Sequence, residues 1–154
     1  MQNNPTVIEK SAGGIVYKRV ASSISWLIVK HKGALHWGFP KGHIGDKNSN
    51  EAIEEAAIRE VQEEGGITAK IVHADSVQTS YFFRRGQTLH KKTVDYFLME
   101  YISGDTKNHD HEVSAAKFLD EETLLETLTF DTDRKAFKKL KNFLPVSSIQ
   151  NQIL

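Results

Sequence analysis

Three glutamates are spaced so that their carboxylates share one face of a predicted helix. Glu60, Glu63 and Glu64 stand at positions i, i+3 and i+4, and at about 100° per residue they fall on the stripe that also holds Ile53 and two alanines. Carboxylates at these spacings repel one another by roughly 0.2–0.5 kcal/mol per pair, even in water. Arg59 alone cannot neutralise all three. Hard divalent ions such as Mg²⁺ prefer carboxylate oxygens, so the pattern predicts a cation site.

For an arbitrary glutamate-rich helix, a solvated acidic face is the commoner structure. Two details favour a site here. The carboxylates continue the apolar stripe rather than lying opposite it, and a glycine-rich loop with a lysine, Gly38-Phe-Pro-Lys-Gly-His43, precedes the helix. Because such loops approach phosphate groups closely, we predict a phosphate site beside the acidic cluster.

The helix that carries the glutamates is predicted over residues 51–64. Asn48, Ser49 and Asn50 are capping candidates at its start, and Gly65-Gly66 can adopt the left-handed backbone of a helix end. Residues 33–50 hold four glycines and one proline, so they predict a long irregular loop leading into the helix.

Strands are expected on both sides of this loop and helix. Residues 12–19 and 25–30 carry β-branched and aromatic side chains, and a hairpin is predicted around residues 20–23. Residues 73–85 and 93–102 predict two longer strands around a turn at Gly86. In the second of them both alternating sets of side chains are largely apolar, which indicates a sheet buried on both faces.

The C-terminal part predicts a short strand at residues 113–119, a helical stretch beginning at Asp120 and a last helix over residues 132–143 with one apolar stripe. Strands and helices interleave along the whole chain. We therefore expect an α/β fold in which a mixed sheet is covered by helices.

Composition narrows the class of protein. The 154 residues fit one domain, with the first six residues expected to be flexible. Twenty basic and twenty acidic side chains give a formal charge of zero, so no strong global field attracts DNA, RNA or an anionic membrane.

The absence of cysteine excludes disulfides and thiolate metal sites. No apolar run is long enough to span a membrane, and residues 1–10 lack the apolar core of a signal peptide, so a cytoplasmic location is expected.

A longer motif now stands out. Glu51, seven intervening residues and then Arg59-Glu60-Val61-Gln62-Glu63-Glu64-Gly65-Gly66-Ile67 resembles the signature of the Nudix hydrolases, Gly-x5-Glu-x7-Arg-Glu-U-x-Glu-Glu-x-Gly-U with U aliphatic. Every fixed position from Glu51 onward is filled. The AGGIVY, WGFPKGH and YFLM segments are also similar to this family, so the resemblance extends over most of the chain.

The signature glycine is the one departure. Gly45 satisfies the five-residue gap to Glu51, but the Gly-Phe-Pro-Lys-Gly-His-Ile segment is similar to the usual entry of the family, which places that glycine at Gly42. We favour Gly42, with a three-residue insertion around residues 46–48.

The resemblance implies an α/β/α sandwich, with the mixed sheet between helices, that cleaves a diphosphate linkage in nucleotides using Mg²⁺ or Mn²⁺ and water. By motif position, Glu60, Glu63 and Glu64 would bind metal and Arg59 would orient them. A backbone carbonyl of Lys41 or Gly42 would complete the metal shell, and the Lys41 ammonium would meet a phosphate. The general base stays open among the three glutamates and Glu112.

Outside the signature, the segment His109-Asp110-His111-Glu112 has ligand-type side chains, but a polar surface loop is the commoner structure. By resemblance, Glu112 is a further candidate metal ligand. Lys41, His43 and Lys92 are candidate substrate contacts, with Lys41 and Lys92 as candidates for binding phosphate. The hairpin cations as a group, Arg84, Arg85, Lys91 and Lys92, can equally be a solvated tip.

Aromatic side chains in the predicted strands offer faces for a nucleobase. The candidates for this role are Tyr81, Phe82, Phe83 and Tyr96, although aromatic residues in strands are more often core. We expect one of them at most to stack on a base.

Within the family, the PKGH loop and the KKTVDYFLM segment most resemble hydrolases of dinucleoside polyphosphates, with hydrolases of oxidised nucleoside triphosphates as the alternative. Fold and signature do not select a substrate. A non-catalytic module that binds a nucleotide or RNA is a third hypothesis. The presence of all three signature glutamates favours an enzyme over such a module.

Overall fold

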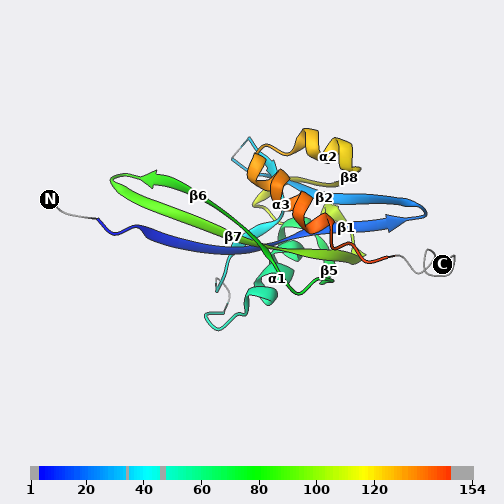
Figure 1. Ribbon diagram of the computed structural model, residues 1–154, viewed down its shortest axis with the longest axis horizontal. Helices are drawn as coiled ribbons and strands as arrows, with labels where there is room; N and C mark the ends of the chain where they lie inside the picture. Colours follow the sequence, from blue (N-terminus) through cyan, green and yellow to red (C-terminus); the bar gives the residue numbers. More distant parts are fainter. Residues whose placement is uncertain (1–3, 34, 46–47, 147–154) are drawn as a thin grey trace.

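The computed structural model describes residues 4–33, 35–45 and 48–146. In this part of the chain, helices lie on both sides of one eight-stranded mixed sheet (Figure 1). The strands are β1 (Val7–Val20), β2 (Ser23–His31), β3 (Trp37–Gly38), β4 (Lys41–His43), β5 (Ile67–Ile71), β6 (Val77–Arg85), β7 (Thr88–Gly104) and β8 (Val113–Leu119). The helices are α1 (Ile53–Gly65), α2 (Glu121–Thr127) and α3 (Asp131–Lys141), with a short 3₁₀ helix at Thr106–Asn108.

The sheet is organised around the long strands β1 and β7. Its main order is β3-β2-β1-β7-β5, while β4 pairs with β1, β6 with β7 and β8 with β2. The β1–β7 pair is parallel, with Ile15 beside Leu98, and the other pairs are antiparallel. The predicted hairpin is confirmed, because Val20 pairs with Ser23. The sheet is therefore mixed, as expected.

Both faces of the sheet are buried, which confirms the interpretation of the alternating pattern in β7. Val94, Tyr96 and Leu98 belong to the core beneath α2 and α3. Phe97 and Met99 point the other way, into the core beneath α1. Because neighbouring residues of a strand face opposite sides, one strand supplies both cores, and the α/β/α layering follows.

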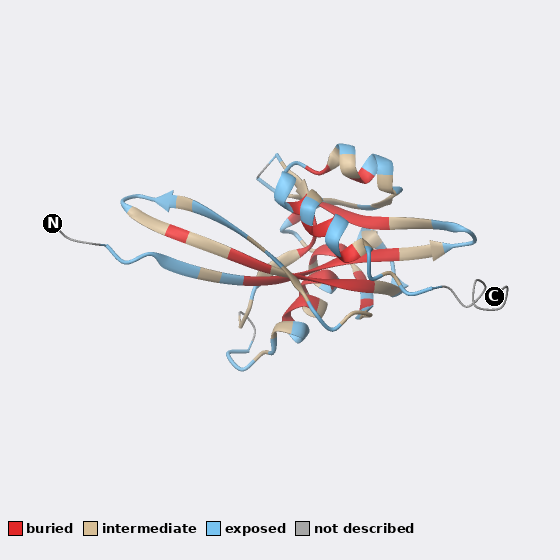
Figure 2. Ribbon diagram, in the orientation of Figure 1, coloured by how far each residue is buried: buried red, intermediate tan, exposed pale blue. Residues whose placement is uncertain are grey.

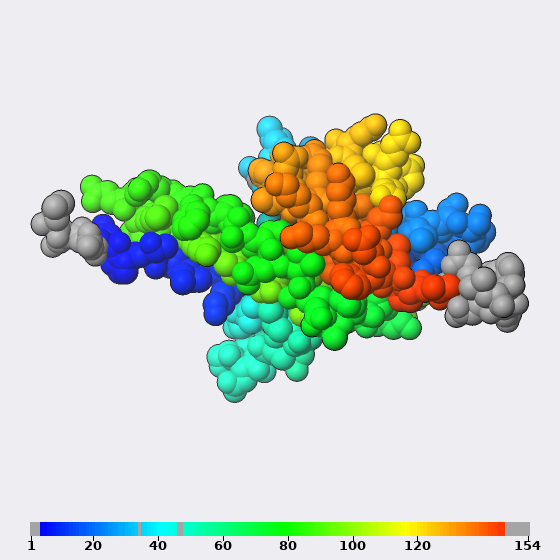
Figure 3. All heavy atoms as spheres, viewed as in Figure 1, coloured from blue at the N-terminus to red at the C-terminus, as the bar shows by residue number. Residues whose placement is uncertain are grey.

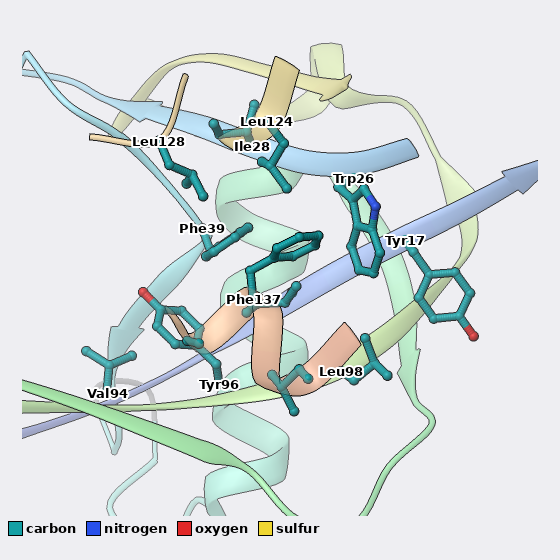
Figure 4. Close-up of a cluster of buried hydrophobic side chains, with 13 residues drawn as sticks. Tyr17, Trp26, Ile28, Phe39, Val94, Tyr96, Leu98, Leu124, Leu128 and Phe137 are labelled. Atoms are coloured by element: carbon teal, nitrogen blue, oxygen red, sulfur yellow. The ribbon is translucent and has the colours of Figure 1, made fainter. Parts of the chain in front are cut away.

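Aromatic rings fill the core beneath α2 and α3 (Figure 4). The Phe137 ring meets the Trp26 ring edge-on at a centroid distance of 4.7 Å. The Phe39 and Tyr96 rings meet in the same way at 5.7 Å. Such edge-to-face pairs stabilise a core beyond the area they bury, so this cluster fixes the position of α3 on the sheet.

One end of the sheet extends beyond the helices as an arm made of β6, the adjoining half of β7 and the start of β1 (Figures 1 and 3). Burial is concentrated where the strands pass between the helices and decreases along the arm (Figure 2). The predicted turn at Gly86 is confirmed: Arg85 pairs with Thr88, and Gly86 has φ of 64°.

Two expectations about the loop and the helix start need correction. Residues 33–50 are not wholly irregular, because β3 and β4 form there by pairing with β2 and β1; these pairings override the local preference of glycine and proline. Helix α1 starts after Ala52 without a side-chain cap. The Asn48 side chain instead accepts a hydrogen bond from the Asn50 amide at 3.0 Å. Strand β5 was not predicted.

The two helices predicted in the C-terminal part agree with the structure. The Asp120 side chain caps α2, accepting from the Thr123 amide, and α3 spans Asp131–Lys141 close to its predicted range. Residues 4–6 are exposed and have no regular structure, whereas residues 1–3 lie outside the described residues. No helix within the described ranges is long and apolar enough to cross a membrane.

Candidate active site

The C-terminal half of α1 buries two of the three signature carboxylates. Glu60 is 4% exposed and Glu64 is 3% exposed, and they follow Ala56 and Ala57 along the buried stripe of the helix. The Glu63 side chain is about one-third exposed. The helix ends at Gly66, whose φ of 75° is the left-handed cap predicted from the sequence. The predicted acidic stripe therefore faces the protein interior.

The loop around β4 lies directly against these carboxylates. The Lys41 amide donates to Glu64 Oε1 at 3.0 Å. A Cβ added to Gly42 would stand 2.2 Å from Glu60 Cδ, so no other residue type fits without displacing the carboxylate. The Gly14 amide donates to the Pro40 carbonyl at 3.1 Å and holds the loop on β1. This close approach requires glycine at position 42.

Arg59 contacts three carboxylates, two of the signature glutamates and Glu51. Its Nε donates to Glu51 Oε2 at 2.7 Å and its Nη2 donates to Glu51 Oε1 at 3.0 Å. Its Nη1 reaches Glu60 Oε1 at 2.7 Å and Glu63 Oε2 at 3.2 Å. The contact with Glu51 was not predicted, whereas the expectation that Arg59 alone cannot neutralise all three signature glutamates agrees with the structure. Glu64 lies outside this network and has the Lys41 amide instead.

The two glycines considered for the signature take different places. Gly42 faces Glu60, whereas the Gly45 amide donates to Glu51 Oε1 at 3.1 Å. Gly45 has φ of 87°, a conformation that favours glycine. Thus Gly42 lies at the carboxylates and Gly45 fixes the glutamate that holds Arg59. Of the predicted insertion, residues 46 and 47 lie outside the described residues.

Burial dominates the electrostatics of the acidic cluster. It raises the pKa of Glu64 to about 8 and the pKa of Glu60 to about 7. Negative charge on Glu112 raises both pKa values further, and Asp110 adds to the effect on Glu64. Hydrogen bonds from Arg59 and from the Lys41 amide act in the opposite direction without cancelling the effect. The site therefore concentrates acidic groups that lack sufficient positive charge.

Asp110 belongs to the segment that the sequence predicts as a polar surface loop. Its amide donates to the Glu63 carbonyl at 2.8 Å, which ties that loop to the end of α1. Sequence alone gave no reason to separate Asp110 from its polar neighbours.

A cleft of about 330 Å³ opens beside the carboxylates. Its lining includes candidates from the sequence: Lys41, Gly42, His43, Glu60, Glu64, Tyr81, Lys92 and Glu112. His31 and His36 line it as well and were missed, since nothing in their spacing marks them as ligands. Burial lowers the pKa of His31 to about 4. The His31 ring is therefore neutral at pH 7, with Nδ1 3.8 Å from Glu64 Oε2.

A second cavity, of about 340 Å³, adjoins the first and shares His36, Lys41 and Tyr81 with it. Phe130 and the start of α3 close its other side. The His36 and Phe130 rings lie 5.3 Å apart between centroids. The combined site therefore has a charged half at α1 and a more aromatic half at α3.

Two predicted substrate contacts lie elsewhere. Phe82 follows Tyr81 along β6 and points to the opposite face of the arm, where it is 60% exposed. The Tyr96 ring is fully buried in the core and offers no face to a base (Figure 4). Arg84, Arg85 and Lys91 do not line either cavity, and Arg85 lies 4.0 Å from Glu9 on the arm.

The donor set suits a hard divalent cation, although no three acidic or histidine side chains in the described ranges form a ready-made cluster. Glu60 and Glu63 turn toward Arg59, and Glu64 turns toward the Lys41 amide. Two buried carboxylates, with further acids close by and the backbone of Gly42 against one of them, supply the oxygen ligands that Mg²⁺ prefers. The metal-binding roles of these residues stay predictions.

Comparison with known proteins identifies relatives of this chain. The chain is 34% identical over 136 residues to the mutator protein MutT4 of Mycobacterium tuberculosis, covering 84% of this chain and 53% of that protein. It thus spans about half the length of that relative. It is 28% identical over 141 residues to the asymmetrical bis(5'-nucleosyl)-tetraphosphatase of Caenorhabditis elegans, covering 90% of this chain and 98% of the relative.

The fold has relatives as well. A crystal structure of a C. elegans Ap4A hydrolase binary complex superposes with a TM-score of 0.71 at 27% identity, covering 88% of this chain and 96% of that one. The sequence profile of the NUDIX domain matches residues 10–140. That range contains α1, the β4 loop and both cavities, and so the chain belongs to the NUDIX domain family.

Proposed function

We propose that this protein is a divalent-metal-dependent pyrophosphohydrolase that cleaves a diphosphate bond in nucleoside polyphosphates, with dinucleoside polyphosphates as its preferred substrates. One observation carries the proposal. The cleft is lined both by the buried carboxylates Glu60 and Glu64 and by the cations Lys41 and Lys92. A polyphosphate with bound Mg²⁺ compensates both sets of charges at once. The ion binds the carboxylates, and the outer phosphate oxygens bind the ammonium groups.

The residues at and beside the cleft have different roles in this reaction. Lys41 and Lys92 offset phosphate charge and hold the chain of phosphates along the cleft. Arg59, fixed by Glu51, holds the carboxylates of Glu60 and Glu63 in position. When bound, the metal ion neutralises phosphate charge and makes water a better nucleophile.

In the chemical step, the water oxygen bonds to phosphorus and the bridging phosphorus–oxygen bond breaks. A carboxylate receives the proton lost by water. Among the candidates Glu60, Glu63, Glu64 and Glu112, the pKa values of Glu60 and Glu64 lie near neutral pH, which suits a general base.

The preference for dinucleoside substrates has two supports. One is the likeness to the nematode tetraphosphatase over nearly its whole length. The other is the aromatic cavity joined to the cleft, where Tyr81, His36 and Phe130 provide flat faces for a base while the phosphates lie at α1. A nucleoside with a long phosphate chain matches this division.

The test is a phosphate-release screen with Mg²⁺ over dinucleoside polyphosphates, ordinary and oxidised nucleoside triphosphates, nucleotide sugars and ADP-ribose. We expect the highest kcat/KM for a dinucleoside polyphosphate, and no turnover with EDTA. Highest activity on an oxidised triphosphate would replace the substrate class and keep the reaction. Binding without turnover of any compound would identify a non-catalytic module and overturn the proposal.

A further inference from the structure

Asp133 is a buried carboxylate on the wall of the aromatic cavity. It lies in the first turn of α3, is 4% exposed and lines the cavity together with Tyr81, His36 and Phe130. Its neighbour Asp131 in the same turn also lines the cavity, but its side chain is 84% exposed. Burying a carboxylate is costly unless it is well compensated. Of these two acids, therefore, only Asp133 has a buried carboxylate in the cavity wall.

The surroundings hold this carboxylate in one orientation. The Tyr96 hydroxyl lies 3.4 Å from Asp133 Oδ1, and the Tyr96 ring is fixed in the core against Phe39. On the other oxygen, Oδ2, the backbone of Gly38 comes so close that a Cβ there would stand 3.2 Å away. Burial raises the pKa of Asp133, whereas the Lys41 charge and the Tyr96 hydrogen bond favour the charged form. Asp133 is therefore held in place before any ligand arrives.

The start of α3 is itself anchored. Arg134 Nε donates to the Leu125 carbonyl at 2.9 Å, its Nη1 meets Asp131 Oδ1 at 2.7 Å, and its Nη2 donates to the Leu128 carbonyl. These bonds tie the first turn of α3 to the end of α2. Phe130 and Asp133 therefore line the cavity from a segment whose position is fixed by these bonds.

We propose that Asp133 determines base specificity by accepting a hydrogen bond from an amino group on the base that enters the aromatic cavity. This inference rests on the proposed function and extends it from the phosphates to the base. An ionised carboxylate only accepts hydrogen bonds, so it pairs with the amino groups of adenine, guanine or cytosine. A base without an amino group leaves a buried carboxylate oxygen unpaired, which is the situation that gives strong discrimination.

Matched substrates isolate the amino group. Diadenosine tetraphosphate and its bis(purine riboside) analogue differ only in the 6-amino groups, and diguanosine and diinosine tetraphosphates differ only in the 2-amino groups. For the wild-type protein we expect kcat/KM to favour the amino-bearing member of at least one pair by about tenfold or more. Equal kcat/KM within both pairs would overturn the inference and leave the proposed function standing.

The Asp133→Asn variant tests the residue. Its amide oxygen can accept from Tyr96, which turns the amide NH₂ toward the cavity as a donor, so the preference for amino-bearing bases should vanish or reverse. Asp75→Asn, at an exposed loop residue that lines neither cavity, is the matched control and should keep the wild-type ratio. A uniform loss over all four substrates in Asp133→Asn would show a structural role and refute the specificity role.

Binding measurements test the role of Asp133 independently of the proposed hydrolysis. Calorimetric titration of the wild-type protein with ATP and with purine riboside 5'-triphosphate, without metal, should show about tenfold tighter binding of ATP. If no substrate is hydrolysed but this difference persists, the proposed function fails and the role of Asp133 stands. Equal affinities, together with equal rates where there is turnover, would refute it.

Discussion

Arg59 and Glu51 form a two-point ion pair, with Nε and Nη2 of the guanidinium 2.7 and 3.0 Å from the two carboxylate oxygens. The pair joins the loop to the helix. Glu51 Oε1 also accepts from the Gly45 amide, and Arg59 Nη2 also donates to the His43 carbonyl at 3.2 Å. Because the remaining nitrogen of Arg59 holds Glu60 and Glu63, this pair sets the position of the acidic cluster relative to the phosphate loop.

Arg59→Lys should therefore lower kcat although it preserves the charge. A lysine cannot make the planar two-point contact with Glu51 and also reach Glu60 and Glu63, and misplacement of catalytic groups by about 1 Å can cost roughly 100-fold in rate. We expect a fall in kcat of about 10- to 100-fold, measured with the best substrate of the screen. Arg19→Lys, at the far end of β1, is the control. A kcat within twofold of wild type would show that the charge alone suffices.

Glu64→Gln should remove most activity and leave the fold intact. The glutamine oxygen still accepts from the Lys41 amide, but the side chain loses the negative charge that a metal ion or a proton requires. We expect kcat to fall by about 10²- to 10⁴-fold, with an unchanged circular dichroism spectrum. The exposed Glu54, on the first turn of the same helix, provides the control Glu54→Gln. Near-normal turnover in Glu64→Gln would remove Glu64 from the catalytic group.

The sequence allowed the acidic stripe to be predicted because helical geometry fixes which side chains share a face. Glu60 and Glu64 are both buried, as the 3.6-residue period requires. In β7, period-two alternation likewise predicted which side chains face each core. These features depend only on local backbone geometry, so each can be predicted from the residues of a single helix or strand.

Contacts between distant segments could not be predicted in this way. Asp133 reaches the cavity because α3 packs on the sheet, and His31 reaches Glu64 because β2 passes beside α1. The three-way contact of Arg59 depends on how the loop brings Glu51 back to the helix. Phe82 lies outside both cavities and Tyr81 lines them, and the sequence did not reveal which face of β6 lines the cavities.

Gly42→Ala should damage the site through a steric clash. The added methyl group would meet the Glu60 carboxylate at 2.2 Å, and overpacking of this kind costs roughly 1–3 kcal/mol of stability. We expect weaker Mg²⁺ binding by calorimetry together with a lower kcat. Gly33→Ala separates the two effects: Gly33 has φ of 79° and open space around it, so its alanine variant should lose stability and retain Mg²⁺ affinity. Equal Mg²⁺ affinity in both variants would contradict the assigned role of Gly42.

The metal-free protein should lose stability as the pH rises through neutrality. Glu60 and Glu64 have an ordinary pKa of 4.5, and in the folded protein burial raises these pKa values to about 7 and about 8. Between these limits the folded state holds more protons than the unfolded state, so the free energy of unfolding decreases with increasing pH. This contribution is fully present below pH 4.5 and is lost by about pH 8. The expected slope is on the order of 1 kcal/mol per pH unit for each carboxylate.

Urea unfolding in EDTA at several values between about pH 5.5 and pH 8.5 measures this slope. Glu64→Gln removes one of the two groups and should make the decline shallower, whereas Glu54→Gln should not. Because a metal ion requires deprotonated carboxylates, Mg²⁺ should bind more tightly as the pH rises over the same range and restore the lost stability. A flat stability profile in EDTA, or Mg²⁺ affinity that does not change with pH, would show that Glu60 and Glu64 are already ionised and compensated without the metal.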